Sequence, residues 1–310
     1  MKEIHKSVLL QEAIDSLSLK EDDVAVDMTL GFAGHSSEIL KRIKKGYLFA
    51  FDQDSEVFTY SRNRLNAIGN NFELIHANFS EAKEELLKRN ITKVDAILYD
   101  LGVSSYQLDN KERGFSYNND AVLDMRMNRD NPLTAKIVVN TYSEQDLTRI
   151  FKLYGESKFA RNIARNIVKK RNEKEINTTL ELVSIIKEAV PIKERLKKHP
   201  AKQIFQAIRI EVNKELDVLI SSLNDSLDLL NVGGRLAVIT FHSLEDKIVK
   251  DTFRKVSETD SLSKGLPNIP EDKLPDFKII TKKGIVPTDK EEEENHRAHS
   301  ARLRVIERIK

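Results

Sequence analysis

The stretch most informative about the fold reads Asp27-Met28-Thr29-Leu30-Gly31-Phe32-Ala33-Gly34-His35. The apolar run Val24-Ala25-Val26 precedes it, and a helical pattern begins near Ser36. This order predicts a short buried strand that ends at Asp27, a glycine turn and then a helix. The turn alone has two interpretations, a ligand-binding loop or an ordinary tight connection.

Three more β-rich runs follow, over residues 47–52, 72–76 and 96–100, with helical stretches between them. This alternation is typical of a parallel sheet covered by helices. Three of the four runs end in an acid, namely Asp27, Asp52 and Asp100. Because ligands bind beyond the carboxyl ends of parallel strands, we expect these acids to point toward one crevice.

The glycines and acids indicate the kind of ligand. Gly31 and Gly34 do not satisfy the G-x-G-x-x-G spacing that seats a pyrophosphate on a helix N-terminus. Asp52 lies 21 residues after Gly31, where a carboxylate can accept both hydroxyls of a ribose. A sulfonium cofactor needs that ribose contact but no phosphate cradle, and its positive charge favours acidic surroundings. The crevice suits S-adenosylmethionine better than NAD, and an NAD-dependent oxidoreductase is the first alternative.

The composition narrows the choice of the chemical group that accepts the methyl group. The 310 residues include no cysteine, which removes disulfides, thiolate metal sites and cysteine nucleophiles. Methylation of carbon 5 of cytosine needs a thiolate that adds to the ring, so that reaction is excluded. An amine, amide or hydroxyl acceptor remains. Residues 100–105 follow the fourth strand where such a fold places the acceptor, although an ordinary strand exit with a serine-capped turn also fits.

The alternation stops after Leu101 and resumes at Arg235. Residues 101–132 lack clear periodicity but contain aromatic and Met side chains, which predicts an ordered active-site loop. Helices are expected over 143–154, 159–170, 179–190 and 200–230, and strands over 235–241 and 302–308. The sheet is therefore interrupted by a helical region and then resumed.

The last part of the chain leaves two interpretations of His242, which follows a strand. It is either a general base or a histidine that holds a loop. Near His296 and His299 no Cys or carboxylate stands at ligand spacing, so no metal site is expected. The Pro-containing stretch (Pro267, Pro270, Pro275, Pro287) and the acidic run Glu291 to Glu294 are expected to be solvated and mobile.

Positive charge is concentrated in one part of the chain. The net charge is only +2, yet residues 152–215 contain 16 Lys or Arg against 8 Asp or Glu. In the helix expected over 159–170, the apolar stripe is Phe159, Ile163 and Ile167, and the opposite face has Arg161, Arg165 and Lys169. The block is either a polyanion-binding surface or a set of solvated helix faces.

The apolar residues predict no membrane association. No apolar run approaches the roughly 18 residues that span a bilayer, and the start lacks the hydrophobic region of a signal peptide. We therefore expect a cytoplasmic protein.

Five segments in order resemble the ribosomal small-subunit RNA methyltransferase H family. They are Asp100-Leu101-Gly102-Val103-Ser104-Ser105, Arg113-Gly114-Phe115-Ser116, Leu123-Asp124-Met125-Arg126-Met127, Phe205-Gln206-Ala207-Ile208-Arg209 and Phe241-His242-Ser243-Leu244-Glu245-Asp246. The resemblance covers nearly the whole chain, from His5 to Val305. It implies an α/β fold, a Rossmann-like class I methyltransferase sheet interrupted by an α-helical insertion domain. The expected parts are 1–106, 107–206 and 207–310.

The resemblance also implies an enzyme that methylates N4 of a cytidine in the decoding region of 16S rRNA, with S-adenosyl-L-methionine as donor and S-adenosyl-L-homocysteine as product. The implied cofactor-binding residues are Ala33, Gly34, His35, Asp52, Phe79, Asp100 and Gln107. No residue is assigned catalysis, and Arg161, Arg165 and Lys169 are the candidate RNA contacts. A noncatalytic RNA-binding or assembly factor on the same fold is the second alternative.

Two positions depart from the family pattern. Ala33 stands where the family usually has glycine, and a methyl group there slightly crowds the backbone, but we expect binding to survive. Lys202-Gln203 stands where Thr-Arg is common, which changes the charge geometry of that contact. Because the basic region has few aromatic residues, it suits shape and backbone recognition, which favours the assembled small ribosomal subunit over naked rRNA as the substrate.

Overall fold

The computed structural model describes residues 7–197, 199–259 and 274–310. The chain divides into two compact units. The first unit comprises Met1–Gly102 and Leu216–Lys310, and the second comprises Val103–Glu215. The second unit is therefore somewhat longer at both ends than the insertion expected over 107–206.

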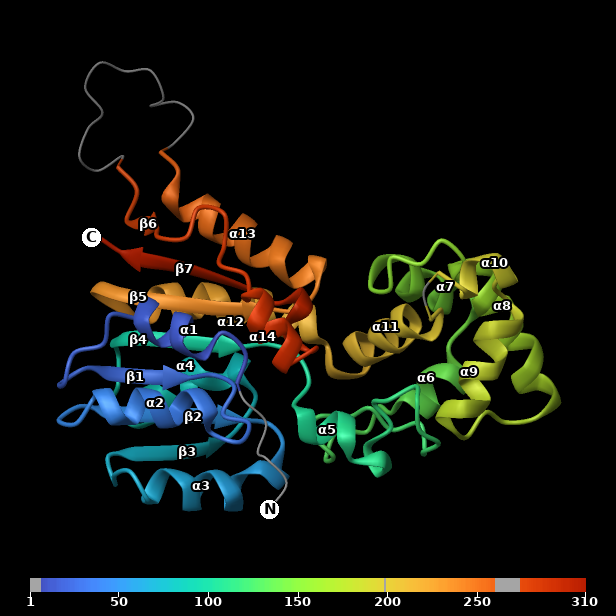
Figure 1. Cartoon of the computed structure of the whole chain (residues 1–310), viewed down its shortest axis with the longest axis horizontal. Helices are drawn as coiled ribbons and strands as arrows, with labels where there is room; N and C mark the ends of the chain where they lie inside the picture. Colours follow the sequence, from blue (N-terminus) through green and yellow to red (C-terminus); the bar gives the residue numbers. More distant parts are fainter. Residues whose placement is uncertain (1–6, 198, 260–273) are drawn as a thin grey trace. The chain divides into compact units, whose positions relative to one another are not determined.

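Within the described ranges, the first unit is built on one seven-stranded sheet with the order β3-β2-β1-β4-β5-β7-β6 (Figure 1). The strands are β1 (Val24–Asp27), β2 (Tyr47–Asp52), β3 (Phe72–His76), β4 (Val94–Asp100), β5 (Leu230–Thr240), β6 (Phe277–Ile279) and β7 (Arg302–Arg308). The first five are parallel, and β7 is antiparallel to both β5 and β6. The sequence prediction identified every strand except β6.

Alternate residues of β1 to β5 and of β7 enter two different apolar layers. Leu48 and Leu98 pack on one face of the sheet, while Phe49 and Ile97 pack on the other. The first face is covered by α1 (Leu10–Ser16), α2 (Gly34–Arg42) and α3 (Phe58–Asn66), and the second by α4 (Ala82–Lys88), α12 (Glu215–Leu229) and α13 (Ser243–Ser257). Burial on both faces explains the continuous apolar runs of the strands.

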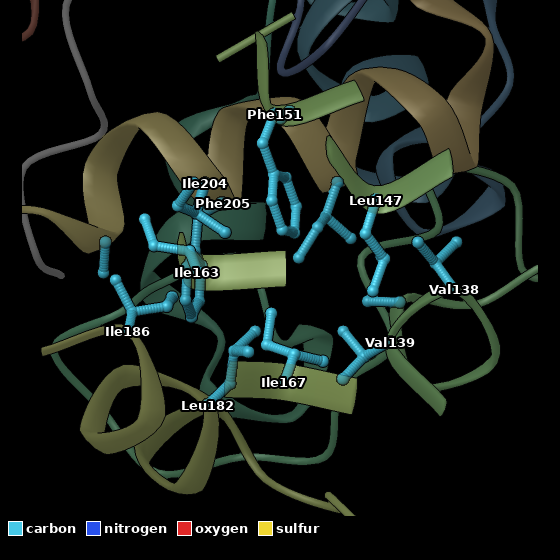
Figure 2. Close-up of a cluster of buried hydrophobic side chains, with 14 of the residues drawn as sticks. Val138, Val139, Leu147, Phe151, Ile163, Ile167, Leu182, Ile186, Ile204 and Phe205 are labelled. Carbon is cyan, nitrogen blue, oxygen red and sulfur yellow. The ribbon is translucent and has the colours of Figure 1, made fainter. Parts of the chain in front are cut away.

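The second unit has an apolar core of its own, made by helices (Figure 2). The helices are α5 (Ser105–Asp109), α6 (Ala135–Thr141), α7 (Glu144–Leu153), α8 (Ala160–Glu173), α9 (Thr179–Glu188), α10 (Ile192–Arg195) and α11 (Ala201–Asn213). Ser143 caps α7 and Thr178 caps α9, each by accepting a backbone N–H with its hydroxyl. These caps stabilise helix starts that the sequence predicted.

One expectation about elements is wrong, and one is incomplete. The single helix expected over 200–230 is broken at Lys214, whose φ of 51° is left-handed, so α11 and α12 are separate helices. The acidic run forms α14 (Asp289–Glu294), capped by Thr288, and the Glu291 carboxylate accepts the Leu9 N–H at 2.7 Å. None of the α14 residues is buried, which agrees with the expected solvated run, and its mobility stays a prediction. The helix and its contact with Leu9 were not predicted, because a pattern of charges does not show such a distant partner. Pro267 and Pro270 lie outside the described residues.

None of the helices in the described part of the chain has the length and apolarity that crossing a membrane requires.

Candidate active site

The turn after β1 is shaped by two residues with left-handed backbone. Gly31 has a φ of 47° and Ala33 a φ of 59°. This conformation costs an L-residue about 1–2 kcal/mol, which explains why glycine suits position 33. Gly34 begins α2 and meets a different constraint, because an added Cβ would lie 1.8 Å from the Ser7 hydroxyl.

Asp27 supports this turn from within. Its side chain accepts hydrogen bonds from the Ser36 hydroxyl at 2.6 Å and from the Thr29 N–H at 3.0 Å. Asp27 is 1% exposed, and burial raises its pKa. The expectation that all three strand-end acids point into the crevice is therefore wrong for Asp27, which orients the start of α2 instead.

Asp52 lies at the carboxyl end of β2 beside the glycine turn. Its two oxygens accept the Gly31 N–H at 2.9 Å and the Asp54 N–H at 2.8 Å. Burial raises the pKa of Asp52 to about 6. Since each carboxylate oxygen has two lone pairs, the two backbone bonds fix the group and leave acceptor capacity for a ligand's hydroxyls.

Phe79 follows β3 in the short helix η2 (Phe79–Glu81). Its ring meets the Tyr99 ring edge-on at 5.5 Å, and its carbonyl accepts the Ser222 hydroxyl at 2.9 Å. The Tyr99 hydroxyl in turn lies 2.7 Å from that of Ser226. Sequence reasoning missed this support because Ser222 and Ser226 lie on α12, more than a hundred residues away in the chain.

Asp100 and His35 meet at the carboxyl end of β4. His35 Nδ1 lies 3.5 Å from an Asp100 carboxylate oxygen, and the other ring nitrogen lies 3.2 Å from the Val8 carbonyl. The Asp100 backbone N–H donates to the Thr29 hydroxyl at 2.7 Å. The remaining Asp100 oxygen, Oδ1, is buried and has no hydrogen-bond partner among the described residues.

The surroundings of this pair disfavour charge. Burial raises the pKa of Asp100 to about 8, and the charges of Asp27 and Glu245 raise it further. Burial also lowers the pKa of His35 to about 4. A group of acids of this kind would gain from a bound cation, because a positive charge relieves the repulsion among the carboxylates.

Six of the seven predicted cofactor residues thus belong to the first unit, at or near the carboxyl ends of β1 to β4. Gln107 belongs to the second unit. It forms a capping box at the start of α5, in which its side chain accepts the Ser104 N–H at 3.0 Å and its N–H donates to the Ser104 hydroxyl at 3.2 Å.

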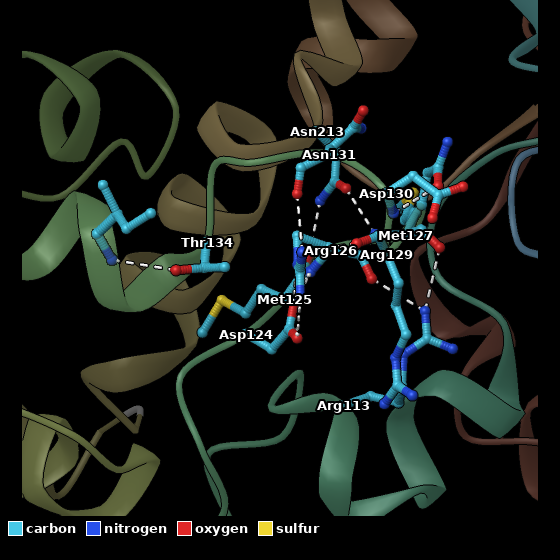
Figure 3. A network of polar contacts seen from close by, with 12 residues as sticks. Arg113, Asp124, Met125, Arg126, Met127, Arg129, Asp130, Asn131, Thr134 and Asn213 are labelled. Atoms are coloured by element: carbon cyan, nitrogen blue, oxygen red, sulfur yellow. Dashed lines mark hydrogen bonds and ion pairs between the residues drawn. The ribbon is translucent and has the colours of Figure 1, made fainter.

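The loop over 101–132 is ordered by side chains that bond to backbone (Figure 3). Arg126 pairs with Asp124 through two hydrogen bonds of 2.8 and 2.9 Å. Asn213 accepts the Met127 N–H at 2.7 Å and donates to the Met125 carbonyl at 2.8 Å. The fully buried Arg113 donates to the Met127 carbonyl at 3.1 Å. These bonds replace the regular pairing that this segment lacks.

The basic helix α8 has the two faces that its sequence predicts. Ile163 and Ile167 are buried in the core of the second unit (Figure 2), whereas Arg161, Arg165 and Lys169 are exposed. Arg165 forms a long ion pair with Glu144, at 3.9 Å.

His242 is the N-cap of α13, so the loop-holding interpretation describes its role in the structure. Its Nδ1 accepts the Glu245 N–H at 3.4 Å, and the Glu245 carboxylate accepts the Phe241 N–H at 2.8 Å. Asp246 forms two hydrogen bonds with Arg304, at 2.6 and 2.9 Å. The segment 241–246 therefore fastens α13 to the sheet.

The strand order and the acid-rich ends of its parallel strands together define a Rossmann-like methyltransferase. The profile of the MraW methylase family matches residues 2–309, and the chain belongs to that family.

Curated relatives cover the same length. The chain is 51% identical to the ribosomal RNA small subunit methyltransferase H of Limosilactobacillus fermentum, over 99% of this chain and 98% of the relative. The protein of the same name from Streptococcus mutans is 53% identical, again over 99% and 98%.

Proposed function

We propose that this protein transfers a methyl group from S-adenosylmethionine to N4 of a cytidine in the decoding region of 16S rRNA. The observation that carries the proposal is the pair of carboxylates, Asp52 and Asp100. They end β2 and β4, the two parallel strands on either side of β1, which leads into a glycine turn without pyrophosphate spacing. The names of the relatives supply the RNA, the absence of cysteine disfavours carbon 5 of cytosine, and the family resemblance supplies N4 as the acceptor.

The residues present fit the donor. Asp52 would accept the ribose hydroxyls, Phe79 would contact the adenine, and the backbone of residues 33–35 would pass close to the nucleoside. When bound, the donor supplies an electrophilic methyl group on a positively charged sulfur. Asp100 Oδ1, which is buried and has no partner in the described part of the chain, is an acceptor suited to such a cation or to an amine N–H.

The amine of cytosine is a poor nucleophile because its lone pair is delocalised into the ring. The protein's main contribution is therefore alignment, which can supply roughly 7–11 kcal/mol of barrier lowering. We propose that Asp100 accepts a hydrogen bond from the amine and orients it. A base that is paired in the RNA would have to be unstacked to reach the site.

The second unit is the proposed RNA-binding part. Arg161, Arg165 and Lys169 form an exposed basic face whose opposite side is buried, so the helix presents its charges without disturbing the core. Gln107 is proposed to complete the cofactor site. We propose the assembled small subunit in the cytoplasm as substrate, because a basic surface with few aromatics suits backbone and shape recognition.

The test combines nucleoside analysis with binding. Mass spectrometry of 16S rRNA from cells that lack the gene should show no N4-methylcytidine at the target, and the wild-type gene should restore it. Unchanged N4-methylcytidine would leave only a noncatalytic RNA-binding or assembly role.

Binding is tested by titrating the purified protein with S-adenosylhomocysteine. Asp52→Asn should weaken binding about 10- to 100-fold, since hydrogen bonds to a charged group are worth about 1.5–3 kcal/mol. The exposed Asp22→Asn is the matched control and should bind as the wild type does. Binding of NADH but not of S-adenosylhomocysteine would favour an oxidoreductase.

A further inference from the structure

His35 has a fixed arrangement of its ring hydrogen. Nε2 lies 3.2 Å from the Val8 carbonyl, and a carbonyl oxygen only accepts hydrogen bonds, so Nε2 carries the hydrogen. In a neutral ring Nδ1 then has only a lone pair. That lone pair faces the Asp100 carboxylate at 3.5 Å, in a place where the His35 side chain is 4% exposed.

The Asp100 side chain is 25% exposed, so the pair is buried on the histidine side and partly open on the carboxylate side. A carboxylate and a ring lone pair that face each other repel, and a proton on Asp100 directed at Nδ1 removes this repulsion. The other charged groups near Asp100 also favour this proton. Asp27 on β1 and Glu245 on α13 are both acids, and among the residues that the structure describes they are the charged groups that shift the pKa of Asp100. Glu245 itself is close to His242, with the two side chains 3.1 Å apart.

We propose that His35 and Asp100 hold one exchangeable proton in the empty enzyme, and that Asp100 releases it when a cationic methyl donor binds and then takes a proton from the cytidine amine. This inference rests on the proposed function and adds a base to it. The raised pKa of Asp100, about 8, agrees with a protonated carboxyl group at neutral pH.

The chemical step balances. The N4 lone pair forms a bond to the methyl carbon while the carbon–sulfur bond breaks, and sulfur keeps that electron pair. The positive charge thereby moves from sulfur to N4. An N–H bond then breaks, its electrons return to nitrogen, and the proton goes to the Asp100 carboxylate, whose proton affinity has risen because the nearby cation has been neutralised. The next donor displaces this proton to solvent.

The first test measures protons released on binding, by calorimetry of the full chain at pH 7 in buffers with different ionisation enthalpies. With a pKa of about 8, S-adenosylmethionine should release about 0.9 proton per site. The uncharged-sulfur product S-adenosylhomocysteine should release far less. Asp100→Asn should abolish the difference between the two ligands, and the exposed Asp228→Asn should retain it.

Equal proton release by the two ligands in the wild-type protein would overturn the proposal of a proton held by His35 and Asp100, even if Asp100→Asn failed to fold. If N4-methylcytidine still formed in that case, the proposed function would stand without the proton held by His35 and Asp100. Failure to bind either ligand would overturn the proposed function and the pair together.

A second test needs no ligand and no activity. Nuclear magnetic resonance of protein labelled with ¹⁵N-histidine and ¹³C-aspartate should show at pH 7 a neutral His35 with hydrogen on Nε2, beside a protonated Asp100. An ionised Asp100 beside a neutral His35 would overturn the proposal. In single turnovers Asp100→Asn should lower the rate of methyl transfer about 10²- to 10⁴-fold, the usual contribution of a general base.

Discussion

Three aspartates end strands of one sheet, yet the structure places each in a different role. Asp27 is enclosed by the turn that it orients, and Asp52 is fixed by two backbone N–H groups. Asp100 faces an imidazole and, within residues 7–197, 199–259 and 274–310, has one oxygen without a hydrogen-bond partner. The residue type is the same in each case. The neighbours determine whether the carboxylate supports the backbone or stays available to a ligand.

The pH dependence of stability follows from Asp100. Its pKa rises from 3.8 to about 8 on folding, so the folded chain holds the proton more tightly than the unfolded chain does. The stabilisation from the protonated Asp100 carboxyl group is fully present below the pKa of this group in the unfolded chain. It is lost as the pH rises through about 8. We expect urea unfolding to show a free energy that falls more steeply between about pH 5 and pH 8 in the wild type than in Asp100→Asn.

His35 does not obscure this comparison. Its pKa is lowered on folding to about 4, so its own contribution is lost as the pH falls, and the residue is present in both proteins. Parallel pH profiles for the wild type and Asp100→Asn would contradict the prediction. Asp22→Asn, on an exposed side chain, should give a profile like that of the wild type.

At the scale of elements, the loop over 101–132 shows how a segment without periodicity becomes ordered. Arg113, Asp124, Arg126 and Asn213 supply the hydrogen bonds that a helix or sheet would otherwise provide (Figure 3). Asn213 lies at the end of α11, so the loop depends on a helix that the chain reaches some eighty residues later.

Asn213→Ala should destabilise the second unit. The side chain is 6% exposed and bonds to the Met127 N–H and to the Met125 and Arg209 carbonyls. Leaving these buried groups unpaired should lower the free energy of unfolding by about 2–4 kcal/mol. Chemical denaturation measures the change. Asn224→Ala, on an exposed face of α12, should cost far less, and an equal cost would argue against the loop's dependence on Asn213.

The basic face of α8 gives a second prediction at this scale. Replacement of Arg161, Arg165 and Lys169 by Ala should weaken RNA binding. The slope of the logarithm of the binding constant against the logarithm of the salt concentration should become shallower by about 2 to 3, because fewer counterions are released when fewer phosphates are contacted. Filter binding at several salt concentrations measures this slope. The control replaces three exposed lysines of the first unit, Lys20, Lys44 and Lys278. An unchanged slope in the α8 variant would remove this face from the RNA site.

At the scale of the whole molecule, each of the two compact units is stabilised by an apolar core of its own. The sheet unit buries two apolar layers, and the helical unit buries a third layer of its own. Local opening is governed by contacts within each compact unit, so a core defect in one need not reach the other.

Ile167→Ala tests this division. The side chain is fully buried in the helical core, and its truncation should cost about 2–5 kcal/mol. Hydrogen exchange followed by mass spectrometry should show lower protection across Val103–Glu215 and unchanged protection in β1, β2 and β4. An equal loss of protection in the sheet would show that the two units unfold together.

The sequence alone determined every strand but β6, much of the helix pattern and the interruption of the sheet, and it favoured one class of ligand, because periodicity, glycine turns and missing cysteines are local or compositional signals. Only the tertiary structure decided that Asp27 faces inward, that Glu291 caps the backbone at Leu9, that Lys214 breaks a helix and that His35 faces Asp100. The physical reason is the same in each case. Burial and hydrogen-bond partners depend on residues far apart in the chain, and no local pattern specifies which distant atoms will meet.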